Sequence, residues 1–164
     1  MSKYISEDTL KRLVRDYGND VLRMCSLYLK DYQLAEDITQ ETFLRVYEKY
    51  YTFENRCSEK TWIMKIAMNL CKNHMRTHGF GNINLDMIPE AKAEDIYEKL
   101  LDKNAISVEI MKLSPKYREV ILLYYYQQLP VKEIALILNK KETTILQWLK
   151  RAREQLKPLL QEVL

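Results

Sequence analysis

The chain has 164 residues, of which 47% are hydrophobic and 30% are charged, and its formal net charge is +3. This length suits one domain or two small ones, and the composition is that of a globular protein. The chain contains only 3 Gly and 4 Pro, whereas average usage of roughly 12% for the two together predicts about twenty. So few turn-forming residues favour an all-α fold. They also leave too few glycines for the phosphate-binding loops of nucleotide-dependent enzymes.

Other features of the sequence narrow the class of protein. No segment approaches the ~18 consecutive apolar residues of a membrane span, and the N-terminus lacks a basic stretch followed by an apolar run. We therefore expect a cytoplasmic protein. Its 3 Cys are scattered and odd in number, which favours reduced thiols over a disulfide framework. No paired nucleophile and base can be identified, so the sequence predicts no enzyme, no cofactor, no metal and no small-molecule substrate.

Charge divides the chain into three parts. The net charge is +2 over residues 1–76, −3 over 77–107 and +4 over 108–164. The middle part has weak apolar periodicity and contains Gly79, Gly81 and Pro89, which is typical of a linker. We therefore expect two small helical domains, 1–78 and 107–164, joined by a flexible acidic linker over 79–106.

The first domain is predicted to contain four helices. Ser6, Asp31 and Ser58 are suitable N-cap residues, and Gly18 followed by Asn19 is expected to break the first helical stretch. The predicted helices cover residues 7–17, 20–30, 32–51 and 59–77. Apolar residues at helical spacing give the last two a core-facing side, namely Leu34, Ala35, Ile38, Phe43, Val46, Ile63, Ile66, Ala67 and Leu70.

The second domain is predicted to begin with a helix over residues 106–113. Ser114 and Pro115 suit an N-cap followed by a first helical position, and Pro130 is expected to start a short helix that ends at Leu138. The helix from Pro115 carries an apolar stripe made of Tyr117, Val120, Ile121 and Tyr124. The last helix is predicted over residues 142–161.

The last two helices have the spacing of a helix-turn-helix. Asn139 lies where the turn needs a left-handed residue, a conformation that Asn tolerates well. In the second of these helices we expect Ile145, Leu149 and Ala152 to face the core. The residues expected to face outward and to contact bases or phosphates of duplex DNA are Thr144, Gln147, Trp148, Lys150, Arg151 and Arg153. The alternative is an ordinary helical hairpin with a solvated basic face.

The segment 60–78 is cationic and contains no acidic residue. Cations beside aromatic and amide side chains suit unpaired nucleic acid, because the backbone attracts charge and exposed bases stack. The candidate contacts are Phe53, Lys60, Trp62, Lys65, Asn69, Lys72, Asn73 and Arg76. The alternative is that the aromatic residues belong to the core or its rim.

Two further groups of residues are candidates for binding. Asp37, Gln40 and Glu41 lie on the side of their helix away from its apolar stripe. This patch suits docking against arginines of a partner, although such a patch is usually only a solvated face. Cys71, His74 and His78 share one helix face and are candidate metal ligands. The paired C-x2-C half of a zinc finger is missing, however, which argues against a metal site.

Two blocks of sequence resemble a known family. The stretches Leu34-Ala-Glu-Asp-Ile-Thr-Gln-Glu-Thr-Phe-Leu-Arg-Val-Tyr47 and Thr61-Trp-Ile-Met-Lys-Ile-Ala-Met-Asn-Leu70 resemble region 2 of extracytoplasmic-function sigma factors of bacterial RNA polymerase. Three further stretches resemble region 4 of the same family, namely Leu113-Ser-Pro-Lys-Tyr-Arg-Glu-Val-Ile-Leu-Leu123, Glu133-Ile-Ala135 and Leu149-Lys-Arg-Ala-Arg-Glu154. The blocks stand in the family's order and cover nearly the whole chain.

The resemblance implies a sigma factor that directs core RNA polymerase to promoters and assists melting of the −10 element. Asp37, Gln40 and Glu41 match positions that dock on the clamp helices of the beta-prime chain, and the family also contacts the beta subunit. The cationic segment matches the reader of the −10 element, and the helix from Glu142 matches the reader of the −35 element. The resemblance also implies an anti-sigma partner.

The sequence departs from the family in the −35 reader. Leu146 and Trp148 stand where the family commonly has basic residues, and Asn139 stands where it often has glycine. Two functions of other classes stay open at this point. One is a regulator that binds duplex DNA without polymerase, and the other is a metal-dependent enzyme or redox sensor that uses Cys71, His74 and His78.

Overall fold

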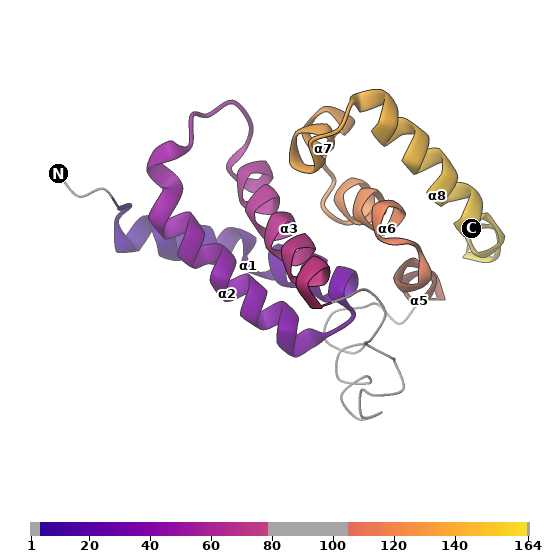
Figure 1. Cartoon of the computed structure of the whole chain (residues 1–164), viewed down its shortest axis with the longest axis horizontal. Helices are drawn as coiled ribbons and strands as arrows, with labels where there is room; N and C mark the ends of the chain where they lie inside the picture. The colour runs from indigo at the N-terminus through magenta and orange to yellow at the C-terminus, as the bar shows by residue number, and fades with distance from the viewer. Residues whose placement is uncertain (1–3, 79–104, 164) are drawn as a thin grey trace.

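The computed structural model describes residues 4–78 and 105–163, and within these ranges the regular structure is entirely helical. Figure 1 shows two groups of helices lying side by side, α1 to α3 in indigo to magenta and α5 to α8 in orange to yellow. The predicted all-α fold with two helical domains is confirmed. The predicted linker, with Gly79, Gly81 and Pro89, falls almost entirely on residues 79–104, outside the described residues.

The first group contains α1 (Glu7–Leu29), α2 (Tyr32–Lys49), the short 3₁₀ helix η1 (Tyr50–Thr52) and α3 (Glu59–His78). All three predicted N-caps are confirmed by hydrogen bonds. The side-chain oxygens of Ser6, Asp31 and Ser58 accept from main-chain N–H groups three residues later, at 3.2, 3.1 and 3.1 Å. Each cap satisfies one of the N–H groups that the first turn of a helix leaves unpaired.

The predicted break at Gly18 and Asn19 is wrong, because α1 runs through both residues. Leu13 before the glycine and Val21 after it are both fully buried. Glycine inside a helix costs about 1 kcal/mol relative to alanine, whereas burying a large apolar side chain contributes roughly 1.5–3 kcal/mol. Continuous packing of one helix face therefore outweighs the local preference to end the helix.

The core of the first group confirms most of the predicted apolar residues. Ala35, Phe43, Val46, Ile63 and Ala67 are buried. The other predicted positions lie nearer the edge: Leu34, Ile38 and Ile66 are half-buried and packed against the core, and Leu70 is half-exposed. The side of α3 that is most deeply buried is formed instead by Met64, Met68, Cys71 and Met75 with Ile63 and Ala67.

The second group contains α5 (Ala105–Lys112), α6 (Pro115–Ile121), the π-helical turn η3 (Leu122–Tyr126), α7 (Val131–Leu138) and α8 (Glu142–Val163). The predicted helix start at Pro115 is confirmed with Ser114 in the N-cap position, although the Ser114 side chain makes no cap hydrogen bond. Pro130 is the N-cap residue of α7, which begins at Val131. The helix from Pro115 widens into η3, where Gln127 N–H donates to the Leu122 carbonyl at 3.0 Å. Periodicity alone did not predict this wider turn, since its apolar residues keep a helical spacing.

Helices α7 and α8 pack against each other as a helix-turn-helix. Asn139 adopts the predicted left-handed conformation, with φ 54° and ψ 50°. Ile145, Leu149 and Ala152 are buried, as predicted. Every helix within residues 4–78 and 105–163 is too short or too polar to span a bilayer.

Candidate nucleic-acid interface

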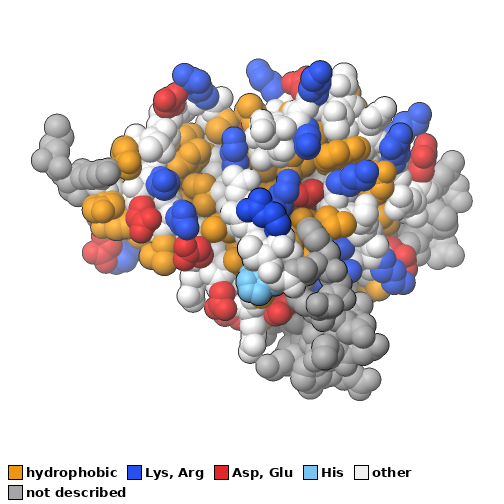
Figure 2. Space-filling view, viewed as in Figure 1, with side chains coloured by type: hydrophobic (Ala, Val, Ile, Leu, Met, Phe, Trp, Pro, Cys, Tyr) orange, Lys and Arg blue, Asp and Glu red, His pale blue; other side chains and the backbone are white. Residues whose placement is uncertain are grey.

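The face of α3 that was predicted to contact unpaired nucleic acid is largely open to solvent. Lys65, Asn69, Asn73 and Arg76 are exposed, and we call these four residues the α3 face. Arg76 Nη2 donates to Asn73 Oδ1 at 2.9 Å, which holds one amide and one cation together. Figure 2 shows Lys and Arg side chains spread over both groups of helices on the visible face, with acidic side chains between them.

Two aromatic residues of the predicted site belong to a cluster beside the start of α3. The ring centroids of Phe53 and Trp62 are 5.4 Å apart, and Tyr50 lies 5.8 Å from Phe53 and 5.9 Å from Trp62. All three residues are half-buried. This arrangement matches the alternative that Phe53 and Trp62 form a rim of the core, and it leaves part of each ring exposed.

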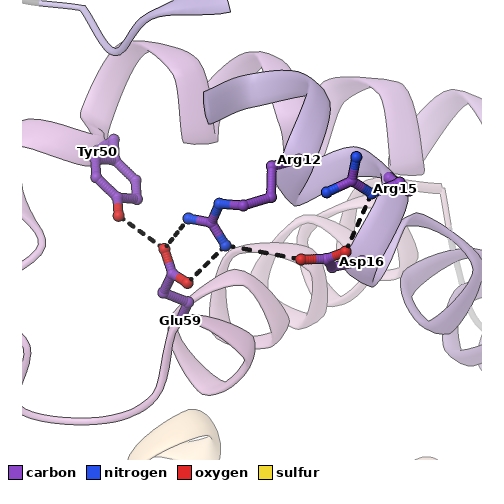
Figure 3. A network of polar contacts seen from close by, with 5 residues as sticks. All are labelled: Arg12, Arg15, Asp16, Tyr50 and Glu59. Atoms are coloured by element: carbon purple, nitrogen blue, oxygen red, sulfur yellow. Dashed lines mark hydrogen bonds and ion pairs between the residues drawn. The ribbon is translucent and has the colours of Figure 1, made fainter. Parts of the chain in front are cut away.

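The first turn of α3 is attached to α1 by a polar network that the sequence did not indicate (Figure 3). Arg12 Nη1 and Nη2 donate to the two carboxylate oxygens of Glu59 at 3.1 and 2.9 Å. Tyr50 Oη donates to Glu59 Oε2 at 2.7 Å. Hydrogen bonds from Arg12 hold the pKa of the Glu59 carboxyl below its usual value, although partial burial acts in the opposite direction. These hydrogen bonds attach the first turn of α3 to α1 and to η1.

Lys60 and Lys72 differ from the rest of the predicted −10 contacts. Lys60 Nζ donates to the main-chain oxygen of Gln127 at 2.9 Å, and Lys72 Nζ lies 3.4 Å from Glu119 Oε1. Both partners belong to the second group of helices. The structure therefore separates the predicted cations into two that contact the second group and two, Lys65 and Arg76, that face solvent.

The acidic patch on α2 is accessible. Asp37 and Gln40 are exposed, and Glu41 is half-exposed and pairs with Arg45 at 3.2 Å one turn later. We call Asp37, Gln40 and Glu41 the α2 patch. Its position on an open helix face agrees with the predicted orientation away from the apolar stripe.

An open groove of about 540 Å³ adjoins the α2 patch. It is lined by Leu10, Val14, Gly18, Asn19, Thr39, Gln40, Phe43 and Leu44. Two apolar side chains of its lining, Val14 and Leu44, are 44% and 57% exposed. The sequence did not indicate this groove, since its walls come from two helices whose relative position periodicity does not specify.

The outer face of α8 is basic and partly apolar. Gln147, Lys150 and Arg151 are exposed, as predicted. Trp148 is half-buried against the core rather than fully outward, and Lys116 Nζ lies 5.8 Å from its ring centroid. The exposed apolar residue is instead Leu146, at 54%.

The two remaining predicted −35 residues are less free to contact DNA, because one is half-buried and the other has a partner within the chain. Thr144 is half-buried. Arg153 is exposed, but its Nε donates to Tyr125 Oη at 2.6 Å and its guanidinium lies over the rings of Tyr124 and Tyr125. This contact to η3 restricts the directions in which Arg153 can reach.

The candidate metal ligands point in different directions. Cys71 is fully buried, and its Sγ lies 3.5 Å from the Sγ of Cys25. His74 and His78 stack near the surface with ring centroids 4.1 Å apart. Partial burial and the neighbouring His78 lower the pKa of His74. Across residues 4–78 and 105–163, no group of three His, Cys, Asp or Glu side chains is arranged to hold a metal ion.

Comparisons with known proteins match both groups of helices. The sequence matches two family models, described as Sigma-70 region 2 over residues 13–80 and Sigma-70, region 4 over residues 103–156. It is 32% identical over 160 residues to the ECF RNA polymerase sigma factor SigM of Bacillus subtilis (strain 168), which covers 92% of this chain and 94% of that protein. It is 31% identical over 171 residues to SigW, an ECF RNA polymerase sigma factor of the same organism, covering 96% and 91%.

Two solved structures have a similar fold. CnrH, in complex with the cytosolic domain of CnrY, has a TM-score of 0.71 at 18% identity and covers 96% of this chain and 90% of that chain. The sigma factor RpoE from Bartonella quintana, in complex with the anti-sigma factor NepR, has a TM-score of 0.71 at 21% identity and covers 95% and 98%. At these identities the likeness concerns the fold alone.

Proposed function

The chain belongs to the extracytoplasmic-function (ECF) family of RNA polymerase sigma factors, and from this premise we propose how its two modules divide promoter recognition. A sigma factor directs core RNA polymerase to specific promoters and so initiates transcription. The first module covers residues 1–78, the second covers 107–164, and 79–106 connect them. The observation that carries this division is that one chain combines the α2 patch and the α3 face with a basic helix-turn-helix.

The α2 patch docks on core polymerase. Asp37 and Glu41 supply negative charge and Gln40 supplies an amide, a combination that suits arginine side chains of the clamp helices of the beta-prime subunit. The patch is exposed and lies on a continuous helix that is packed into the core on its other side. Rigid support of this kind keeps the side chains in position for docking. The beta subunit is the expected partner of the second module.

The α3 face and the aromatic cluster contact the −10 element. Lys65 and Arg76 attract the phosphate backbone of the opened strand, and Asn69 and Asn73 offer amide groups to an unpaired base. Unstacking a base costs a few kcal/mol, which a pocket and a cationic track offset. Phe53 and Trp62, each half-buried, are the aromatic contacts that we propose for exposed bases. Lys60 and Lys72 complete the set of predicted contacts.

Helix α8 reads the −35 element in duplex DNA. Gln147, Lys150 and Arg151 are exposed; in this proposal Gln147 contacts a base edge in the major groove, while Lys150 and Arg151 contact phosphates. Exposed Leu146 is suited to contact a thymine methyl group. Trp148 and Thr144 support the position of this face from the edge of the core, and Arg153 contributes charge from its site beside Tyr125.

We propose that the chain acts in the cytoplasm, where polymerase and promoter DNA are found, and that it performs no catalytic step of its own. The reaction chemistry belongs to the polymerase, and the family consists of regulatory proteins. We also expect an anti-sigma factor as a partner. The similar structures of CnrH with CnrY and of RpoE with NepR support this expectation.

Promoter-specific run-off transcription with purified core polymerase tests the function. The wild-type chain should bind core and start transcription at defined promoters, and the charge reversals Asp37→Lys and Glu41→Lys should weaken core binding without unfolding the protein. Glu48→Lys, an exposed reversal near the end of the same helix, is the matched control and should bind core normally. Failure of the wild type to bind core, with intact binding to duplex DNA, would instead establish a polymerase-independent regulator.

A further inference from the structure

Side chains from three separate elements meet at the start of α3 (Figure 3). Arg12 belongs to α1, Tyr50 to η1 and Glu59 to α3, and we call these three residues the Glu59 network. Arg12 donates both Nη groups to the Glu59 carboxylate at 3.1 and 2.9 Å, and Tyr50 Oη donates to its Oε2 at 2.7 Å. One carboxylate therefore joins α1, η1 and α3.

The Glu59 network joins the two ends of a segment that has no regular structure. Residues 53–58 connect η1 to α3 and contain neither helix nor strand. Tyr50 precedes this segment and Glu59 follows it, so the hydrogen bond between their side chains bridges it. Arg12 attaches the same end of the segment to α1. Within the segment Asn55 adopts a left-handed conformation with φ 58°, which Asn tolerates well. The segment is thus restrained at both ends by side chains.

Tyr50 links the Glu59 network to the aromatic cluster. Its hydroxyl donates to Glu59, and its ring centroid lies 5.8 Å from that of Phe53 and 5.9 Å from that of Trp62. Its main-chain oxygen also accepts from Phe53 N–H at 2.9 Å. The network therefore holds the hydroxyl end of a ring that contacts both of the aromatic residues proposed for exposed bases.

The ion pair in this network specifies direction as well as attraction. The side chains of Arg12 and Glu59 are 39% and 24% exposed, so the pair is only partly open to solvent. Two parallel hydrogen bonds between a guanidinium and a carboxylate fix the relative orientation of the two groups. A lysine ammonium is a point charge and does not reproduce this geometry. The start of α3 is therefore held in one orientation relative to α1.

From these contacts we propose that Arg12, Tyr50 and Glu59 are positioning residues for recognition of the −10 element. They act through Phe53 and Trp62, whose rings they hold in the arrangement that receives an unpaired base. This inference rests on the proposed function, because the arrangement matters for DNA only if the aromatic cluster serves the −10 element. Rings that are ordered before binding lose less conformational entropy when a base stacks on them. The network thereby strengthens stacking without adding a contact to DNA.

Two conservative substitutions weaken the network and leave every ring of the aromatic cluster in place. Tyr50→Phe removes only the hydroxyl group, and Arg12→Lys keeps the charge but loses the two parallel hydrogen bonds. The matched controls are Tyr47→Phe, at a half-buried tyrosine of α2, and Arg15→Lys, at an arginine of α1 whose side chain is 74% exposed. Circular dichroism confirms that each variant is folded, and Tyr50→Phe alone is used if Arg12→Lys unfolds.

Fluorine NMR of Trp62 tests the positioning without using DNA. Fluorotryptophan labels both of the 2 Trp of the chain, and the signal that disappears in Trp148→Phe identifies the other as that of Trp62. The wild-type chain should give one narrow signal for Trp62. Tyr50→Phe and Arg12→Lys should broaden or divide this signal and leave that of Trp148 unchanged, whereas the two controls should leave both unchanged. A Trp62 signal of wild-type width in the folded network variants would overturn the proposal.

Removal of single bases tests whether this positioning serves DNA. A promoter identified by run-off transcription is prepared with its −10 region held open by mismatches, and one base at a time is removed from the open region while its sugar and phosphate stay. Stacking of one base on an aromatic side chain corresponds to about a 5-fold to 150-fold change in binding. Holoenzyme formed with the wild-type chain should therefore bind several-fold less tightly when the stacked base is missing.

The network variants should lose affinity only where that base is present. Holoenzymes with Tyr50→Phe or Arg12→Lys should bind the intact open promoter several-fold less tightly than wild type, and should bind the promoter that lacks the base as tightly as wild type. Equal weakening on both promoters would mean a merely structural role and would overturn the proposal. A wild type that is insensitive to every missing base would instead contradict the proposed −10 contact of the aromatic cluster, and the positioning role would fall with it.

Discussion

Arg12 of α1 and Glu59 of α3 form a bidentate ion pair, in which Nη1 donates to Oε1 at 3.1 Å and Nη2 donates to Oε2 at 2.9 Å (Figure 3). Tyr50 adds a third hydrogen bond to the same carboxylate. The pair joins residues 47 positions apart at the start of the helix that carries the proposed −10 contacts. The pair therefore joins the start of α3 to α1.

We expect Glu59 to stabilise the fold in a pH-dependent way. Arg12 and Tyr50 lower its pKa below the ordinary 4.5, so its contribution is complete above pH 4.5 and is lost as pH falls through the folded pKa. Glu59→Gln should reduce stability near neutral pH and weaken the acid dependence below 4.5. Urea unfolding at a series of pH values measures this, with Glu48→Gln as the exposed control. An unchanged acid dependence in Glu59→Gln would contradict the prediction.

We expect Glu119 to give the opposite pH dependence of stability from that of Glu59. Burial raises its pKa, although Lys72, Tyr28 and Arg118 all act to lower it. Native protein then holds this proton better than unfolded protein, so stability should fall as pH rises from about 4.5 through the folded pKa. Glu119→Gln should remove that decline. The same pH series of urea unfolding measures it, and a decline of wild-type size in Glu119→Gln would contradict this account.

The three cysteines should differ in reactivity. The contact with Cys25, together with burial, raises the pKa of the Cys71 thiol, and both residues are fully buried. Cys57 is half-buried, and burial also raises the pKa of its thiol. Because the reactive species is an accessible thiolate, iodoacetamide should modify Cys57 first and reach Cys25 and Cys71 only on unfolding. Mass spectrometry over time measures this, and early modification of Cys71 would show that α1 and α3 separate in the native state.

Asn139 should determine the stability of the helix-turn-helix. Its φ of 54° is left-handed, a conformation that costs an ordinary residue about 1–2 kcal/mol. Asn139→Ala should therefore lower the free energy of unfolding by about 1 kcal/mol, and Asn139→Gly should keep it close to wild type. Urea unfolding measures both, with the exposed neighbour change Lys140→Ala as control. Equal stability of the Ala and Gly variants would mean that the turn relaxes.

We expect residues of α8 to contribute to DNA binding in two different ways, some through phosphate contacts and others through base contacts. Arg151→Ala should weaken binding to −35 duplex similarly for all sequences and reduce the salt slope by about 1, since one phosphate contact is lost. Gln147→Ala should cost about 1–3 kcal/mol for one preferred base and leave the salt slope unchanged. Fluorescence anisotropy with polymerase present measures both. A sequence-dependent effect of Arg151→Ala would reverse the two roles.

Much of the fold could be predicted from the sequence because it depends on local rules. Caps at Ser6, Asp31 and Ser58, and the left-handed turn at Asn139, follow from side-chain chemistry within a few residues. The buried positions of the last helix follow from its 3.6-residue period. The predicted helix break at Gly18 was wrong because local rules do not include tertiary packing. The packing that keeps α1 continuous comes from residues distant in the chain.

The candidate site shows where local rules end. The sequence by itself determined the all-α class, the division of charge between two modules and the family, since composition, periodicity and motif order carry that information. Only the tertiary structure decided that Arg12 meets Glu59, that Trp148 is half-buried while Leu146 is exposed, and that Lys60 and Lys72 contact the second module. These relationships depend on how helices pack across the chain, and a helical period specifies which face is buried but not which helix covers it.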